Sequence, residues 1–158
     1  FIAATCSFAV STQTGPDAVC LAFRRPVCYI DVTRYSQFFF GTKLAWWNPA
    51  ELWQGDSRLT LRDILRGPVF WIKDPNDFIR EGIRQVRSDS ERINHLVMSF
   101  VESFENNFHW NTSEDIATNT VQKLIEDQVG TVGREQFGRI AAVLNPGFVR
   151  QSGDWYLV

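Results

Sequence analysis

The stretch "FAVSTQTGPDAVCLAFRRPVCYIDV", residues 8–32, decides the fold class. A short strand at residues 7–10 is followed by a polar turn and then by an apolar helical run from Asp17 to Phe23. Pro26 ends that helix, and the nearly continuous β-branched and aromatic run Val27–Val32 is typical of a strand buried in a parallel sheet. Strand, helix and strand within about 25 residues form the βαβ pattern. We therefore predict an α/β fold, with a Rossmann-like open parallel sheet flanked by helices.

The remainder of the chain predicts a largely helical carboxyl-terminal part. The aperiodic segment from Arg34 to Ser57 predicts a long loop of the kind that often carries function. After it we expect a helix at Leu59–Leu65 with Thr60 as its cap, a strand at Val69–Ile72 and a helix at Phe78–Val86. Next we expect a helix that Ser88 caps with Glu91 and that runs to about Glu105. A last helix is expected to begin at residues 111–113 and to be broken by Gly130 and Gly133. Residues 1–158 are expected to form a single domain.

Composition excludes several classes of protein. The net charge of −2 argues against a general nucleic-acid-binding protein, which would carry a basic excess. No apolar run approaches the roughly 18–20 residues that a transmembrane helix needs. Cys6, Cys20 and Cys28 are odd in number, lack C-x-x-C spacing and lie in apolar contexts, so we expect buried free thiols. Free thiols fit a cytoplasmic protein better than a secreted one.

The polar turn between the first strand and the first helix has two interpretations. It contains Ser11, Thr12, Thr14, Gly15, Pro16 and Asp17. Capping of the helix explains these residue types. Binding of an anionic ligand explains them too, because a helix amino terminus attracts phosphate, the hydroxyls donate to phosphate oxygens and glycine allows close approach. Pro16 costs such a site one N–H donor, and the charge of Asp17 suits a sugar or ribose hydroxyl better than a phosphate.

Three residues further along are candidates for the same site, since ligands of open parallel sheets bind beyond the carboxyl ends of the strands. Asp31 would bind a sugar or ribose hydroxyl or cap a helix, and Tyr35 would lie beside it. Lys43 would contact a phosphate or simply be exposed. Arg58, Arg62 and Arg66 are spaced by four, so they would share one solvated helix face.

No metal site is predicted. His95 and His109 have no second histidine, cysteine or carboxylate at a ligand spacing, and the chain has no Asp-x-Asp pair. It also lacks the G-x-S-x-G and phosphate-loop motifs, so no catalytic residue is assigned.

Several segments together resemble a family of bacterial glycosyltransferases with two Rossmann-like domains, the GT-B architecture, associated with surface-polysaccharide genes. The similarity covers most of the chain. The segments are residues 8–32, the lysine loop "GTKLAWW" around Lys43, "LTLRDIL" at 59–65 and "RIAAVLNPGFVRQSGDWYLV" at the carboxyl terminus. The resemblance is to the carboxyl-terminal, donor-binding half of that family, and its weight comes from the order of the segments.

The resemblance implies that the chain binds a nucleoside-diphosphate sugar, with the turn at residues 11–17 facing the pyrophosphate. The sugar would pass to a glycan or lipid-linked acceptor in surface-polysaccharide synthesis, in the cytoplasm or at the periphery of the inner membrane. No cofactor is implied, because helix termini and side chains can stabilise the departing diphosphate in place of a metal. The absent amino-terminal domain would supply acceptor contacts and the catalytic base, so this chain alone is expected to bind nucleotide without turnover.

Two other functions remain open from the residues. A sugar-nucleotide epimerase of similar fold would keep the same turn and would use Asp17 or Asp31 as its acidic residue. A non-catalytic interaction domain would use the tryptophan-rich stretch of Trp46, Trp47 and Trp53 as its contact surface. The alternative, purely structural interpretation of those tryptophans is that they cover the sheet.

Overall fold

The computed structural model of this chain describes residues 1–38, 41–106, 112–137, 142–145 and 148–149. Its elements are, in order, α1 (Ile2–Thr5), β1 (Ala9–Ser11), α2 (Asp17–Ala22), β2 (Val27–Val32), the 3₁₀ turn η1 (Tyr35–Gln37), β3 (Ala45–Pro49), β4 (Glu51–Gln54), β5 (Ser57–Arg58), α3 (Leu61–Arg66), the 3₁₀ turn η2 (Pro68–Trp71), α4 (Pro75–Arg80), β6 (Ile83–Val86), α5 (Ser90–Glu105), α6 (Thr112–Phe137) and β7 (Val143–Leu144).

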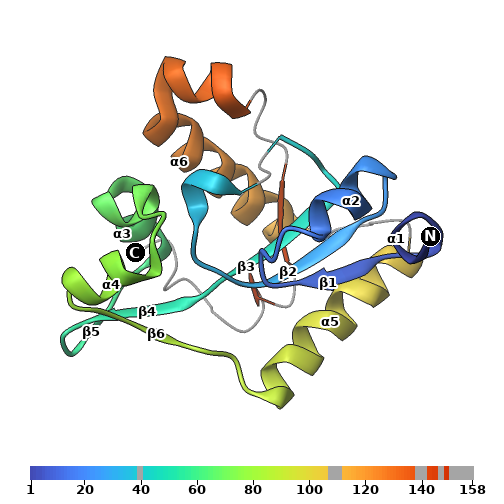
Figure 1. The fold of residues 1–158 in the computed structure, drawn as a ribbon, viewed down its shortest axis with the longest axis horizontal. Helices are drawn as coiled ribbons and strands as arrows, with labels where there is room; N and C mark the ends of the chain where they lie inside the picture. Colours follow the sequence, from blue (N-terminus) through green and yellow to red (C-terminus); the bar gives the residue numbers. More distant parts are fainter. Residues whose placement is uncertain (39–40, 107–111, 138–141, 146–147, 150–158) are drawn as a thin grey trace.

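The fold is α/β, with a parallel sheet flanked by helices (Figure 1). Strands β1, β2, β3 and β7 lie side by side in that order, and every neighbouring pair is parallel. The βαβ unit predicted for residues 8–32 is confirmed, since α2 and β2 lie where the apolar pattern indicates. The expected sheet and its class are therefore correct.

Aromatic side chains fill both faces of this sheet. Neighbouring residues of a strand point to opposite faces. Accordingly the ring of Trp46 contacts Phe100 of α5 at 5.3 Å between ring centroids, while Trp47 contacts Tyr35 of η1 at 6.1 Å. Helix α5 thus covers one face and the η1 segment covers the other. Trp46 and Trp47 are each only 1% exposed, so they belong to the core and not to a contact surface.

A second, antiparallel sheet lies beyond the carboxyl edge of β3. Its strand order is β5-β4-β6, and β4 continues from β3 after the single residue Ala50. The long loop expected for Arg34–Ser57 is therefore wrong, because it contains β3, β4 and the first residue of β5. Asn48 and Pro49 obscure any strand pattern, and what makes Ala45–Pro49 a strand is its pairing with β2, which a local pattern does not reveal.

Three other local predictions are wrong in instructive ways. Val69–Ile72 reads as a strand, yet Pro68 begins a 3₁₀ turn over most of it. The helix expected over Phe78–Val86 ends at Arg80, because Gly82 adopts a φ of +65° and the chain then enters β6. The cap of α5 is Asp89, whose carboxylate accepts from the Arg92 N–H at 2.8 Å.

The remaining helices agree with the sequence pattern. Thr60 caps α3 in a reciprocal capping box with Asp63, and α5 runs to Glu105. Helix α6 contacts α3 and β7. Gly130 interrupts α6 with a φ of +54°, as expected, whereas Gly133 does not end it. None of the described helices is long and apolar enough to cross a membrane.

Candidate functional site

The turn after β1 is held by its own side chains. The Ser11 hydroxyl donates to the Asp17 carboxylate at 3.2 Å and lies 3.4 Å from the Thr14 hydroxyl. Asp17 is only 4% exposed, so its charge is directed into the turn. Gly15, with a φ of +91°, supplies the left-handed backbone that closes the turn. Thr12 and Thr14 stay exposed.

The amino terminus of α2 offers few donors to an anion. Pro16 has no N–H, and the helix is only six residues long. The Ala18 N–H donates to the Gly15 carbonyl at 3.0 Å and lies 3.2 Å from the Asp17 carboxylate, and the Val19 N–H donates to the Pro16 carbonyl at 3.1 Å. These amides are engaged within the turn, so the helix terminus adds no independent support for a pyrophosphate beside Gly15.

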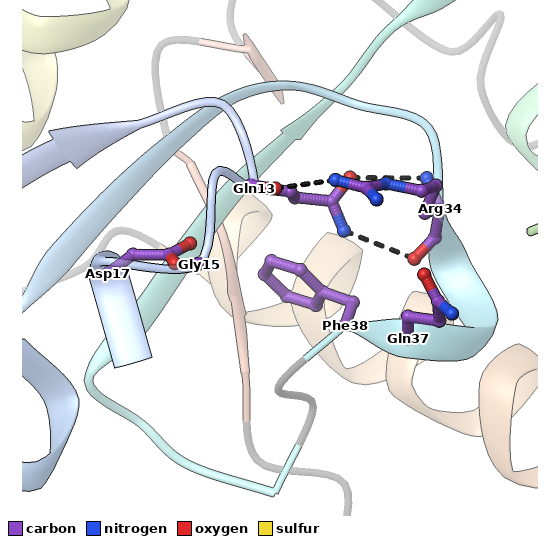
Figure 2. Close-up of a pocket in the computed structure, with 6 residues that line it drawn as sticks. All are labelled: Gln13, Gly15, Asp17, Arg34, Gln37 and Phe38. Atoms are coloured by element: carbon purple, nitrogen blue, oxygen red, sulfur yellow. Dashed lines mark hydrogen bonds between the residues drawn. The ribbon is translucent and has the colours of Figure 1, made fainter. Parts of the chain in front are cut away.

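Gln13 and Arg34 join the loops that follow β1 and β2 (Figure 2). The Gln13 side-chain oxygen accepts from the Thr33 and Arg34 N–H groups, each at 3.1 Å, and its amide nitrogen donates to the Arg34 carbonyl at 3.1 Å. The Arg34 guanidinium donates back to the Gln13 carbonyl at 2.6 Å. Gln13 has a φ of +62°, a rarely populated conformation that clusters at functional sites.

A small pocket lies beside this Gln13–Arg34 clasp. Its volume is about 160 Å³, and Figure 2 shows its lining residues, with the Phe38 ring between the clasp and the turn. The lining residues are Gln13, Gly15, Asp17, Arg34, Gln37 and Phe38. Because the pocket has one carboxylate and one guanidinium on its wall, it does not select an anion by charge alone.

A larger cleft of about 680 Å³ adjoins it, between the carboxyl edge of the parallel sheet and the α4–β6 segment. The sheet side carries the polar residues Thr12, Asp31, Thr33 and Arg34, and Arg87 and Ser88 extend this polar lining. The α4–β6 side is mainly apolar, with Pro75, Phe78, Ile79 and Ile83, together with Gln85, and Ile93 of α5 is a further apolar lining residue. The volume lies within the range of about 300–1,000 Å³ that small-molecule sites occupy.

Asp31 links the carboxyl edge of the sheet to the segment before α5 on the polar side of this cleft. Its carboxylate accepts from the Ser88 N–H at 2.9 Å and from the Ser88 hydroxyl at 2.7 Å, and its backbone φ is +53°. Asp31 therefore anchors the segment before α5 and is not the helix cap. Each carboxylate oxygen keeps a further lone pair for a ligand hydroxyl, so the expected sugar or ribose contact remains a prediction.

Tyr35 and Lys43 lie away from the cleft. The Tyr35 side chain is fully buried against Trp47 and Phe70, and burial, with the charge of Asp31 as a smaller cause, raises its pKa above the ordinary tyrosine value. Lys43 is exposed at the amino edge of the sheet, where the neighbouring Leu44 carbonyl accepts from the Val27 N–H at the start of β2. The structure thus brings neither side chain to the predicted site.

Other residues that were considered as possible clusters do not lie together in the structure. Arg58 lies in β5 and forms an ion pair with Glu51 at 2.9 Å, so it does not share the helix of Arg62 and Arg66. His95 is exposed on α5, and His109 falls outside the described residues. In the part of the chain that the structure describes, no group of three or more His, Cys, Asp or Glu is placed to hold a metal ion.

Sequence reasoning missed Gln13, Arg34, Arg87 and the apolar wall of the cleft. Arg34 follows the end of a buried strand, which was a usable signal, but its pairing with Gln13 depends on the register between β1 and β2. Phe78 and Ile79 appeared as ordinary helix residues. Comparison of the chain with known protein families, curated proteins and solved structures finds no match. The residues of the cleft are therefore the basis on which a function is inferred.

Proposed function

We propose that this chain is the donor-binding part of a sugar transferase and that a nucleoside-diphosphate sugar binds in the cleft between the parallel sheet and the α4–β6 segment. The single observation that supports it best is this cleft of about 680 Å³, with arginines on its polar side and an apolar wall opposite. It lies at the carboxyl edge of an open parallel sheet, which is where ligands of such sheets bind.

The charges of the cleft suit a diphosphate. Arg34 uses one guanidinium N–H on the Gln13 carbonyl, and a guanidinium has five N–H donors, so several remain for phosphate oxygens. Arg87 supplies a second guanidinium to the same cleft. Two guanidinium groups would stabilise the charge of a departing diphosphate. On this proposal the arginines take over the role that the turn amides were expected to have.

The remaining lining suits the other parts of the donor. Phe78, Ile79 and Ile83 offer an apolar surface for a base or a sugar ring. Thr12, Asp31 and Thr33 offer hydroxyl and carboxylate groups for sugar hydroxyls. On this proposal a second domain supplies the acceptor contacts and the catalytic base, as the resemblance to two-domain glycosyltransferases implies.

The rigidity of the site also supports the proposal. The Gln13 side chain fixes the backbone of Thr33 and Arg34 through three hydrogen bonds, and Ser88 fixes Asp31 through two. Groups that are held before the ligand arrives lose less entropy on binding.

Calorimetric titration with uridine diphosphate, guanosine diphosphate and inorganic pyrophosphate tests the proposal. We expect millimolar or tighter binding of at least one nucleotide, and a loss of about tenfold or more in Arg34→Gln and Arg87→Gln. Arg24→Gln is the matched control, because Arg24 is exposed beyond the carboxyl end of α2, near the amino edge of the sheet. Absence of heat with every nucleotide, or an equal loss in Arg24→Gln, would contradict the proposal.

A further inference from the structure

The small pocket beside the Gln13–Arg34 clasp has room for a single six-membered ring. Its volume is about 160 Å³. For comparison, an apolar cavity of about 150 Å³ in a protein core accommodates benzene. Sites for larger, drug-sized ligands occupy about 300–1,000 Å³. The pocket therefore fits one ring of a ligand and is too small for a whole nucleoside.

Arg34 lies on the border between this pocket and the larger cleft. It lines both cavities, and Thr12 of the cleft precedes Gln13 of the pocket in the chain. On the proposed function the Arg34 guanidinium binds the diphosphate of the donor. The sugar of such a donor is bonded to one of these two phosphates, so it lies directly beside the small pocket.

The lining of the pocket combines hydroxyl partners with an apolar surface, as a sugar ring requires. The Asp17 carboxylate accepts from the Ser11 hydroxyl at one oxygen and lies 3.2 Å from the Ala18 N–H at the other, and each oxygen keeps a further lone pair. The exposed Gln37 amide can both donate and accept. Figure 2 shows Asp17 and Gln37 on either side of the Phe38 ring.

The charges of the pocket distinguish one class of sugar from another. Asp17 and Arg34 are its charged lining residues. A diphosphate bound at Arg34 more than neutralises the guanidinium, which leaves the Asp17 carboxylate uncompensated. Asp17 is only 4% exposed, and solvent screens a buried charge much less than an exposed one. A second carboxylate in this pocket would therefore be repelled.

We infer, on the basis of the proposed function, that this pocket holds the transferred sugar and selects a neutral hexose over a hexuronic acid. The two sugars differ at the sixth carbon, where a hydroxymethyl group is replaced by a carboxylate. Asp17 accepts hydrogen bonds from the hydroxyls of the neutral ring and repels the acidic one. The hexose in this pocket leaves Thr12, Asp31 and Thr33 of the cleft to the ribose hydroxyls.

Calorimetric titration with matched pairs of donors tests the inference. The pairs are UDP-glucose with UDP-glucuronate, UDP-galactose with UDP-galacturonate, and GDP-mannose with GDP-mannuronate. Because the nucleotide and the diphosphate are the same within a pair, any difference in Kd comes from the sugar. In at least one pair the hexose form should bind about tenfold or more tightly than the hexuronate form. Equal Kd values in every pair, or tighter binding of the hexuronate forms, would overturn the inference.

Two variants test the residues. Gln37→Ala should weaken binding of the preferred hexose form about threefold to tenfold and leave binding of the free nucleoside diphosphate unchanged. Asp17→Asn should remove most of the discrimination against the hexuronate form. Asn94→Ala is the matched control for Gln37→Ala, because it removes an exposed amide of α5 that lines neither cavity. The wild-type pairs and Gln37→Ala keep the inference testable if Asp17→Asn does not fold.

Methyl hexopyranosides separate this inference from the proposed function, because they contain no nucleotide. Titration of methyl glucoside, galactoside and mannoside should give a saturable NMR shift of the Gln37 side-chain amide for at least one of them. This shift without binding of any nucleotide would support the sugar pocket and contradict the proposed function. Nucleotide binding with no such shift and no difference within any donor pair would contradict the sugar pocket alone.

Discussion

Gln13 and Arg34, which are 21 residues apart in the chain, bind each other through both backbone and side chain. Three of the four bonds between the two loops use the Gln13 side chain, and the fourth uses the Arg34 guanidinium. This clasp fixes the ends of two neighbouring parallel strands relative to each other. It also sets the position of the one arginine that lines both the small pocket and the larger cleft.

Gln13→Ala is expected to lower the free energy of unfolding by about 1–3 kcal/mol, because it leaves the Thr33 and Arg34 N–H groups without their partly buried acceptor. Urea denaturation followed by tryptophan fluorescence measures the change. Gln37→Ala is the control, since Gln37 lines the same pocket but is exposed. Equal stability of the wild type and Gln13→Ala would show that the clasp does not hold the loops.

Asp31→Asn and Ser88→Ala test the link between the sheet and the segment before α5. Asparagine tolerates the left-handed backbone conformation of residue 31. Asp31→Asn therefore removes the side-chain charge and keeps the backbone conformation. Each change alone should cost about 1–2 kcal/mol of unfolding free energy, because the bonds involve a charged acceptor. The double variant should lose clearly less than the sum of the two. Strict additivity would mean that the two side chains do not interact in solution.

Phe78→Ala distinguishes the contribution of the nucleoside from that of the diphosphate to binding. We expect it to weaken the binding of a nucleoside diphosphate by about fivefold to tenfold, since an aromatic contact with a ring is worth about 1 kcal/mol. Binding of inorganic pyrophosphate, which has no ring, should not change. Titrations of both ligands into one preparation of the variant give the comparison. An equal loss of affinity for the two ligands would mean that the nucleobase binds elsewhere.

Alkaline pH should destabilise the protein. Burial raises the pKa values of Cys28, Tyr29 and Tyr35 above the ordinary values of 9.0 for a thiol and 10.0 for a phenol. The folded state therefore keeps protons that the unfolded state releases, so the free energy of unfolding falls as the pH rises above about 9. Each group contributes up to about 1.4 kcal/mol per pH unit in that range.

Denaturation in urea over a series of pH values measures this slope. Cys28→Ala removes one of the three groups and should make the slope shallower from about pH 9 upward. A stability that remains constant above pH 10, the ordinary value of the buried phenols, would contradict the assignment.

The parts of the fold that could be predicted are those that local chemistry dictates. The βαβ unit follows from an apolar run, a proline stop and a buried strand, and the helix after residue 89 follows from its apolar stripe. Strand β3 could not be predicted in this way, because its strand character comes from pairing with β2 and β7. Strand β6 could not be predicted either, because its residues were expected to continue the helix from which Gly82 separates them.

The candidate site was predictable to a similar degree. Thr12 and Asp31, two of the residues predicted for the site, line the cleft at the carboxyl edge of the sheet. Lys43 was expected to reach a phosphate from a long loop, whereas β3 begins at Ala45 and Lys43 therefore lies at the opposite, amino edge of the sheet. The Gln13–Arg34 clasp and the apolar wall of α4 depend on contacts between distant segments, which no single stretch of the sequence encodes.

The central claim is that a nucleoside diphosphate binds in the cleft beside Arg34. Amide chemical shifts of the isotope-labelled protein, recorded by NMR during titration with uridine or guanosine diphosphate, test it most directly. The account predicts saturable shifts concentrated at residues 12–13, 31–34 and 87–88, with residues 43–44 at the opposite edge unaffected. Shifts centred on residues 43–44, or no saturable shifts with either nucleotide, would contradict it.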